Sequence, residues 1–209
     1  MPSPIQTLTA AEEKLFRSLN NPKKIQDFVN SLSKKPETKN THIVRSPRTV
    51  LETRTANCME GALLAAAIFL YHGEKALLFD LKVGKHNDDD VDHVVALFER
   101  DGHWGAISKT SHAVLRYREP IYKTLRELAL SYFHEYFTNN DGKKTLRSFS
   151  KPFDVHKRFG TRWVTTEHDI FEIASALDDS PHFDILTKTM ERNLRPADPI
   201  EIEAGRLME

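Results

Sequence analysis

The stretch that decides the fold is Thr55-Ala-Asn-Cys-Met-Glu-Gly-Ala-Leu-Leu-Ala-Ala-Ala-Ile-Phe-Leu-Tyr71. It predicts a helix that begins at Cys58, because the side chain of Asn57 suits an N-cap and can accept a free backbone N–H of the first turn. Apolar residues surround this helix on all sides, and Gly73 suits the position that follows a helix end. We therefore expect a buried central helix with a thiol at its first position.

Cys58 is the only cysteine of the 209 residues. A thiol at the start of a helix lies at the positive end of the helix dipole, so we expect a lowered thiol pKa and a stabilised thiolate. The unpaired N–H groups of the first turn can also hold an oxyanion. The alternative interpretation is a small buried apolar side chain with no chemical role.

Three antiparallel strands are predicted after this helix, over residues 75–83, 91–99 and 104–110. The segment 84–90 between the first two is a charged loop. Asp101-Gly102 is a strong signal for a two-residue hairpin loop between the last two strands.

This hairpin loop fixes which residues share a face. It places Val95 opposite Ser108 and His93 opposite Thr110, and alternate residues of a strand point to the same side. His93, Ser108 and Thr110 therefore lie on one face, where either hydroxyl can reach the imidazole. A cysteine nucleophile needs such a histidine as base and acid, and a third group to orient the ring.

Three segments carry a resemblance to a known family: Val50-Leu-Glu-Thr-Arg-Thr-Ala-Asn-Cys58-Met-Glu-Gly-Ala-Leu, Asp92-His93-Val-Val-Ala-Leu and Trp104-Gly-Ala-Ile-Ser108-Lys-Thr110. Their order and spacing resemble the transglutaminase-like superfamily, which has a papain-like core, and the chain is similar to bacterial members of unassigned activity. In that family the cysteine opens a buried helix, the histidine begins a strand, and an aspartate or asparagine ends the adjacent strand. The family pattern Trp-x-x-x-Asp-x-Thr has its acid where this chain has Ser108.

The resemblance implies a cysteine-dependent acyl-transfer enzyme with Cys58, His93 and Ser108 as catalytic residues. Its substrate would be a peptide or a small amide. Water as acceptor gives a protease or amidase, and an amine gives transamidation. Serine cannot offset imidazolium charge as a carboxylate does, so Thr110 or Asp92 are alternative orienting residues. A catalytically inactive binding or scaffold module of the same fold is the alternative function.

The predicted fold class is α+β, with the buried helix against an antiparallel sheet and helices flanking it at both ends. We expect a single domain over residues 1–209, with a core at about 40–137 and a helical C-terminal extension over 138–209. The expected N-terminal helices cover residues 9–19, 22–32 and 47–52. The later part is expected to hold helices over 120–137, 166–177 and 182–194, an irregular segment over 145–165, and a last short helix that Asp198 caps.

Composition excludes several classes of protein. The 30 basic and 30 acidic residues balance, so we expect no nucleic-acid partner and no anionic membrane surface. The longest apolar run, 62–71, is about half a membrane span, and the first residues lack a signal-peptide pattern, which favours a cytoplasmic protein. We expect neither a cofactor nor a metal, because paired metal-ligand motifs are missing and Asp88-Asp-Asp90 lacks the EF-hand spacing. The sequence predicts no oligomeric state.

Overall fold

The computed structural model describes residues 4–36, 43–84 and 92–207. Within these residues, one seven-stranded antiparallel sheet has the order β6-β5-β4-β3-β7-β9, and β8 also pairs with β3. The strands are β3 (Leu77–Val83), β4 (His93–Arg100), β5 (His103–Ile107), β6 (Arg118–Tyr122), β7 (Leu146–Ser150), β8 (Phe153–Asp154) and β9 (His182–Asp184). A separate short parallel pair joins β1 (Ser33–Lys34) to β2 (Thr55–Ala56).

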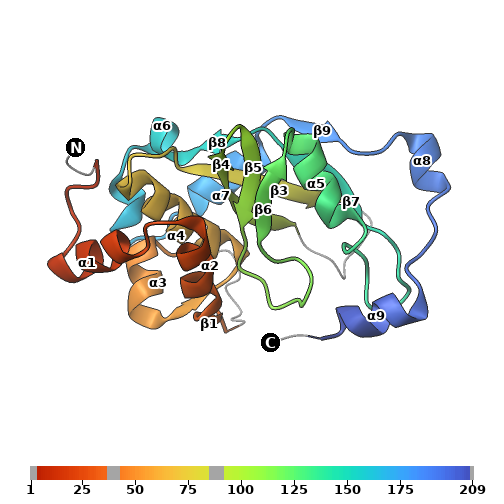
Figure 1. Ribbon diagram of the computed structural model, residues 1–209, viewed down its shortest axis with the longest axis horizontal. Helices are drawn as coiled ribbons and strands as arrows, with labels where there is room; N and C mark the ends of the chain where they lie inside the picture. The colour runs from red at the N-terminus through yellow and green to blue at the C-terminus, as the bar shows by residue number, and fades with distance from the viewer. Residues whose placement is uncertain (1–3, 37–42, 85–91, 208–209) are drawn as a thin grey trace.

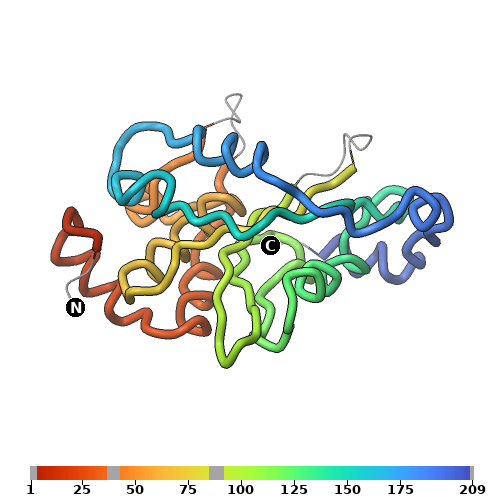
Figure 2. Tube along the Cα trace, turned by 90° about the horizontal axis from the view of Figure 1, so that it is seen from above, coloured from red at the N-terminus to blue at the C-terminus, as the bar shows by residue number. Residues whose placement is uncertain are grey.

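Helices lie on both faces of the sheet and at both ends of the molecule. They are α1 (Ala10–Ser18), α2 (Pro22–Asn30), α3 (Pro47–Thr53), α4 (Cys58–Tyr71), α5 (Leu125–Phe133), α6 (Val155–Phe159), α7 (Phe171–Asp178), α8 (Lys188–Arg192) and α9 (Pro199–Gly205), with a 3₁₀ turn, η1 (Arg162–Val164). The N-terminal α1 and the C-terminal α8 lie at opposite ends (Figure 1, Figure 2). This mixed architecture confirms the predicted combination of helices with an antiparallel sheet.

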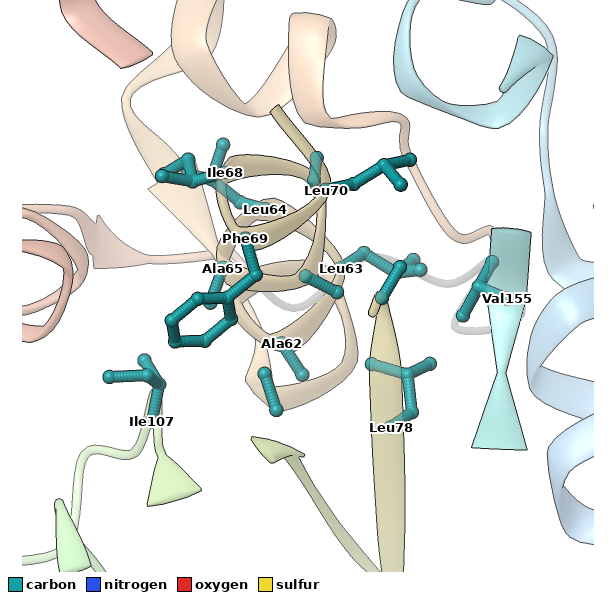
Figure 3. Packing of buried hydrophobic residues seen from close by; sticks show 14 of the residues in the cluster. Ala62, Leu63, Leu64, Ala65, Ile68, Phe69, Leu70, Leu78, Ile107 and Val155 are labelled. Carbon is teal, nitrogen blue, oxygen red and sulfur yellow. The ribbon is translucent and has the colours of Figure 1, made fainter. Parts of the chain in front are cut away.

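The central helix α4 begins and ends where the sequence predicts. The side chain of Asn57 accepts the backbone N–H of Glu60 at 2.9 Å, and the Glu60 side chain returns to the Asn57 backbone as a capping box. Gly73 follows the helix with a φ of 81°, a left-handed conformation that glycine adopts without strain. The helix is buried from Met59 to Leu70, against the sheet and the N-terminal helices (Figure 3).

The two faces of the sheet belong to two separate apolar clusters. One face packs against α4 with Leu78, Val94, Ala96, Phe98 and Ile107. The opposite face packs against α5 with Phe79, Leu81, Val95, Leu97 and Ala106. Successive residues of a strand alternate between these faces, so each position on β3, β4 and β5 is assigned to the α4 face or to the α5 face.

The β4–β5 hairpin confirms the predicted register. Arg100 pairs with His103, and Asp101 and Gly102 have φ angles of 51° and 72°. Positive φ at both loop residues matches the turn that suits the twist of two antiparallel strands. The regular pairing continues to Ala96 and Ile107, which brings the start of β4 beside the end of β5.

The predicted helix over 182–194 is wrong. Its first residues form β9, which pairs with β7, and only Lys188–Arg192 is helical. Phe183 pairs with Phe149 across these strands, and their ring centroids lie 5.7 Å apart with the planes tilted by 39°. A long-range strand pairing therefore overrides the local helical pattern.

Two other expectations also need correction. The segment 145–165 is not irregular, because it contains β7, β8, α6 and η1. The helix expected over 120–137 begins only at Leu125, since residues 118–122 form the edge strand β6. Pro120 lies within that strand, and an edge is where a strand tolerates proline.

The N-terminal helices and the last short helix follow their predicted signals. Thr9 caps α1 with a capping box, Asn21 caps α2 ahead of a proline, and Asp198 forms a capping box with Glu201 at α9. The charged loop predicted at 84–90, with Asp88, Asp89 and Asp90, lies outside the described residues beyond Gly84. Among the helices described, none is long and apolar enough to cross a bilayer.

Candidate functional site

Cys58 is the first residue of α4, as predicted, but its thiol does not have the predicted pKa. The residue is half-buried, and desolvation of its thiol raises the pKa, as does the negative charge of Asp80. The backbone N–H groups of Val94, Met59 and Cys58 act in the opposite direction and lower it, without overcoming burial. The stabilised thiolate expected from the helix dipole is therefore wrong for the resting protein, because desolvation of the sulfur outweighs the dipole.

His93, at the start of β4, is hydrogen-bonded to Ser108, at the end of β5. Its Nε2 lies 2.8 Å from Ser108 Oγ, and Ser108 Oγ donates to the carbonyl oxygen of Leu115 at 2.6 Å. A hydroxyl has one hydrogen to donate, and Ser108 gives it to Leu115. His93 must then donate from Nε2, so the neutral ring carries its lone pair on Nδ1.

The imidazole of His93 is neutral over the physiological pH range. Burial of the ring, with further lowering by the charges of His112 and Arg118, reduces its pKa to about 4, and a hydrogen bond to the Leu115 carbonyl oxygen acts in the opposite direction without overcoming burial. A neutral ring with a fixed Nε2–H and an Nδ1 lone pair is the form that a general base requires.

The backbone of Ser108 is held from α2 by the side chain of Gln26. Gln26 Nε2 donates to the Ser108 carbonyl at 2.8 Å, and its Oε1 accepts the Ser108 N–H at 2.9 Å. The next residue, Lys109, donates from Nζ to the carbonyl oxygen of Leu32 at 2.6 Å. These buried contacts fix the end of β5 in the position from which Ser108 reaches the imidazole.

The other two residues considered for orienting the ring have different partners. Asp92 Oδ1 accepts the backbone N–H of Val83 at 2.8 Å, and Thr110 Oγ1 accepts the backbone N–H of His112 at 3.0 Å. Of Ser108, Thr110 and Asp92, the structure therefore brings the Ser108 hydroxyl to the ring.

Cys58 and His93 approach the sheet from opposite sides. His93 pairs with Leu81, on the face that α5 covers, whereas the thiol lies beside the backbone N–H of Val94 on the α4 face. Within the described residues no hydrogen bond joins the sulfur to the ring. Because His93 is the first residue of β4, the two side chains can meet only around the end of that strand.

Sequence reasoning missed Gln26, the Leu115 carbonyl and the ion pairs of Glu60. Gln26 is 82 residues from Ser108, and nothing in the amphipathic pattern of α2 distinguishes it from a solvated glutamine. Leu115 acts through its backbone, which carries no sequence signal. Glu60 did have a signal, since a glutamate three residues after an N-cap Asn57 is the pattern of a capping box.

Comparisons with protein-family models and with curated proteins find no match to this chain.

Proposed function

We propose that this protein is a cysteine-dependent acyl-transfer enzyme in which Cys58 is the nucleophile, His93 the proton carrier and Ser108 the residue that positions the ring. The observation that carries the proposal is the hydrogen-bond chain from His93 Nε2 through Ser108 Oγ to the Leu115 carbonyl. These two hydrogen bonds leave the lone pair of His93 on Nδ1, and the acceptor of the thiol proton needs such a lone pair. The transglutaminase-like resemblance of the same residues supports the same roles.

The proposed reaction starts from a neutral thiol and a neutral imidazole. As Cys58 Sγ forms a bond to the substrate carbonyl carbon, its proton passes to His93 Nδ1 and the carbonyl electron pair moves to oxygen. In this proposal the N–H groups of Cys58 and Met59 at the start of α4 bind that oxyanion. When the tetrahedral intermediate collapses, the carbon–nitrogen bond breaks and His93 protonates the departing amine.

The second step releases the acyl group from the sulfur. Water or an amine attacks the thioester, His93 takes a proton from it, and the thiol is regenerated as the carbon–sulfur bond breaks. Water gives hydrolysis of a peptide or small amide, and an amine gives transamidation. Ser108 accepts the Nε2 hydrogen throughout but carries no charge, so it stabilises the imidazolium less than a carboxylate would.

A catalytically inactive binding or scaffold module is the second candidate function. It is favoured by the raised thiol pKa, by the serine in place of the family acid, and by the approach of Cys58 and His93 from opposite faces. In that case Cys58 fills space at the start of α4, and the bond between His93 and Ser108 joins β4 to β5.

The pH profile of thiol alkylation separates the two functions. A thiol activated by His93 reacts with iodoacetamide at a rate that depends on the neutral ring, so the rate rises through a pH of about 4 and is flat above it. A thiol without a base reacts as its thiolate, so its rate climbs about tenfold per pH unit up to its raised pKa. We expect the flat profile for the native protein and the climbing profile for His93→Ala.

Matched controls make this measurement specific. His103→Ala changes another histidine of the same hairpin, one whose Nδ1 lies 2.8 Å from the Asp101 carbonyl, and should leave the profile flat. Ser108→Asp restores the family acid and should raise the pKa of His93, and with it the pH through which the alkylation rate rises. A climbing profile in the native protein, unchanged by His93→Ala, would establish the inactive module.

A further inference from the structure

Three carboxylates that are far apart in the sequence converge next to the sheet. Asp80 lies on β3, Asp92 directly precedes β4, and Asp178 ends α7. Each has a carboxylate oxygen within 4.8 Å of the corresponding oxygens of the other two. Such crowding of negative charge is unfavourable unless a cation lies between the groups.

Asp80 supplies the second observation, because one of its oxygens is buried without a partner. The residue is 3% exposed, and its Oδ2 is 3.1 Å from His182 Nε2, but its Oδ1 has no hydrogen-bond partner. The hydroxyl of Ser180, whose carbonyl oxygen lies 2.7 Å from Nδ1 of the same imidazole, is also buried and unpartnered. A buried carboxylate oxygen without a hydrogen-bond partner is costly, and a cation bound to it would offset that cost.

The positive charges already present do not balance the cluster. Lys82 Nζ lies 2.5 Å from Asp178 Oδ1 and also donates to the Asp178 carbonyl oxygen at 3.1 Å. Asp92 is held by the neutral Val83 N–H, not by a cation. Among the described residues, Lys82 faces Asp178 and His182 faces Asp80, so Asp92 is left without a cationic hydrogen-bond partner.

We propose that Asp80, Asp92 and Asp178 bind a hard divalent cation of the Ca²⁺ or Mn²⁺ kind. All three offer carboxylate oxygens, the ligands that such cations prefer, and the cluster presents no thiolate or thioether that would select a softer metal. Asp80, whose Oδ1 has no hydrogen-bond partner, supplies the buried ligand, and Asp178 at the helix end supplies the exposed one. His182 holds the other oxygen of Asp80, as a supporting residue does for a metal-binding carboxylate.

This proposal is independent of the proposed acyl-transfer function. Asp80 pairs with Val94 across β3 and β4, and its charge acts on the Cys58 thiol, so the cation would lie near the start of α4. The site requires neither a reactive thiol nor a basic ring.

The direct test is a titration of the full chain with Mn²⁺. The paramagnetic relaxation of water protons measures the bound Mn²⁺, and Ca²⁺ is added as a competitor. We expect saturable binding of one Mn²⁺ per chain below about 1 mM, the weak end of the range for protein calcium sites. Asp92→Asn and Asp178→Asn should each weaken binding by about 10-fold or more. Asp179→Asn, which changes the exposed neighbour outside the cluster, should leave binding unchanged.

Lys82→Met provides an independent test in the opposite direction. It removes the ammonium that competes for Asp178, so the cation should bind more tightly than it does to the native protein. Asp178→Asn changes an exposed side chain and leaves the core intact, which keeps the comparison valid if Asp92→Asn unfolds. Failure of both the native protein and Lys82→Met to bind Mn²⁺ at about 1 mM would overturn the proposal, as would equal affinities for the native protein and Asp178→Asn.

Discussion

Replacing Glu60 with glutamine should destabilise the protein far more than the same change at an exposed glutamate. Glu60 is fully buried, and its carboxylate accepts from Arg45 Nε at 2.9 Å, Arg45 Nη2 at 2.7 Å and Lys35 Nζ at 2.9 Å. The backbone N–H groups of Arg45 and Asn57 also donate to it, at 3.0 and 3.2 Å. Glutamine keeps the shape but removes the charge, so two cations lose their counter-ion.

The magnitude follows from the burial of the partners. Breaking a buried ion pair costs about 3–5 kcal/mol, and the side chains of Arg45 and Lys35 are 18% and 16% exposed, so the lower end applies. We expect a loss of about 3 kcal/mol in the free energy of unfolding, or roughly 6–12 °C in melting temperature for a chain of this size. Urea denaturation at pH 7 measures the first quantity and calorimetry the second.

Glu74 provides the matched control. It also pairs with an arginine through two hydrogen bonds, to Arg100 Nη1 and Nη2 at 2.8 Å each, but both side chains are more than a third exposed. Glu74→Gln should therefore cost at most about 1 kcal/mol. Equal losses for Glu60→Gln and Glu74→Gln would refute the reasoning from burial.

The stability difference between the native protein and Glu60→Gln should depend on pH in a defined direction. Burial acts to raise the pKa of Glu60, but the hydrogen bonds from Arg45 and Lys35 together lower it by more than burial raises it. The folded pKa of Glu60 therefore lies below the ordinary value of 4.5. A lowered carboxyl pKa stabilises the fold above the unfolded pKa, and this stabilisation is lost as the pH falls through the folded pKa. The gap between native protein and Glu60→Gln should therefore shrink below pH 4.5.

Two further outcomes are expected. Gly61→Ala should destabilise the protein by about 1–3 kcal/mol in urea denaturation, because the new Cβ would lie 2.4 Å from Lys109 Cβ. Alanine normally favours a helix over glycine, so a gain in stability would contradict this close contact. The His93 ring should titrate by NMR with a pKa of about 4. Since this folded pKa lies below the ordinary 6.5, stability should fall by about 3 kcal/mol as the pH drops from 6.5 to 4; a midpoint at 6.5 or above would show that the ring is solvated.

The sequence predicts the elements whose signals are local. The N-cap of Asn57 and the apolar circumference of the helix after it define α4, and the Asp101-Gly102 loop sets the register of β4 and β5. That register places the hydroxyls of Ser108 and Thr110 on the face of His93, and the structure shows that Ser108 is the one that contacts the ring. Both are consequences of short-range geometry, which the chain specifies within a few residues.

The elements that sequence reasoning misses depend on distant partners. Strand β9 forms because Phe183 meets Phe149 on β7, and no local pattern distinguishes its three residues from a helix start. The pKa of Cys58 is likewise set by the layers that bury it, whereas only the helix dipole can be inferred from its neighbours in the chain. The carboxylate cluster joins residues 98 positions apart, Asp80 and Asp178, and has no motif at all.

A helix without a solvent face has a consequence for how this chain is made. The partners of α4 include α1, α2 and α3, which precede it, but also β3, β4 and η1, which are synthesised later. Until the ribosome has released residue 164, the end of η1, the nascent chain exposes part of the apolar surface of α4 to water. A polypeptide stopped before that point would therefore be prone to aggregate and would be a natural client for chaperones.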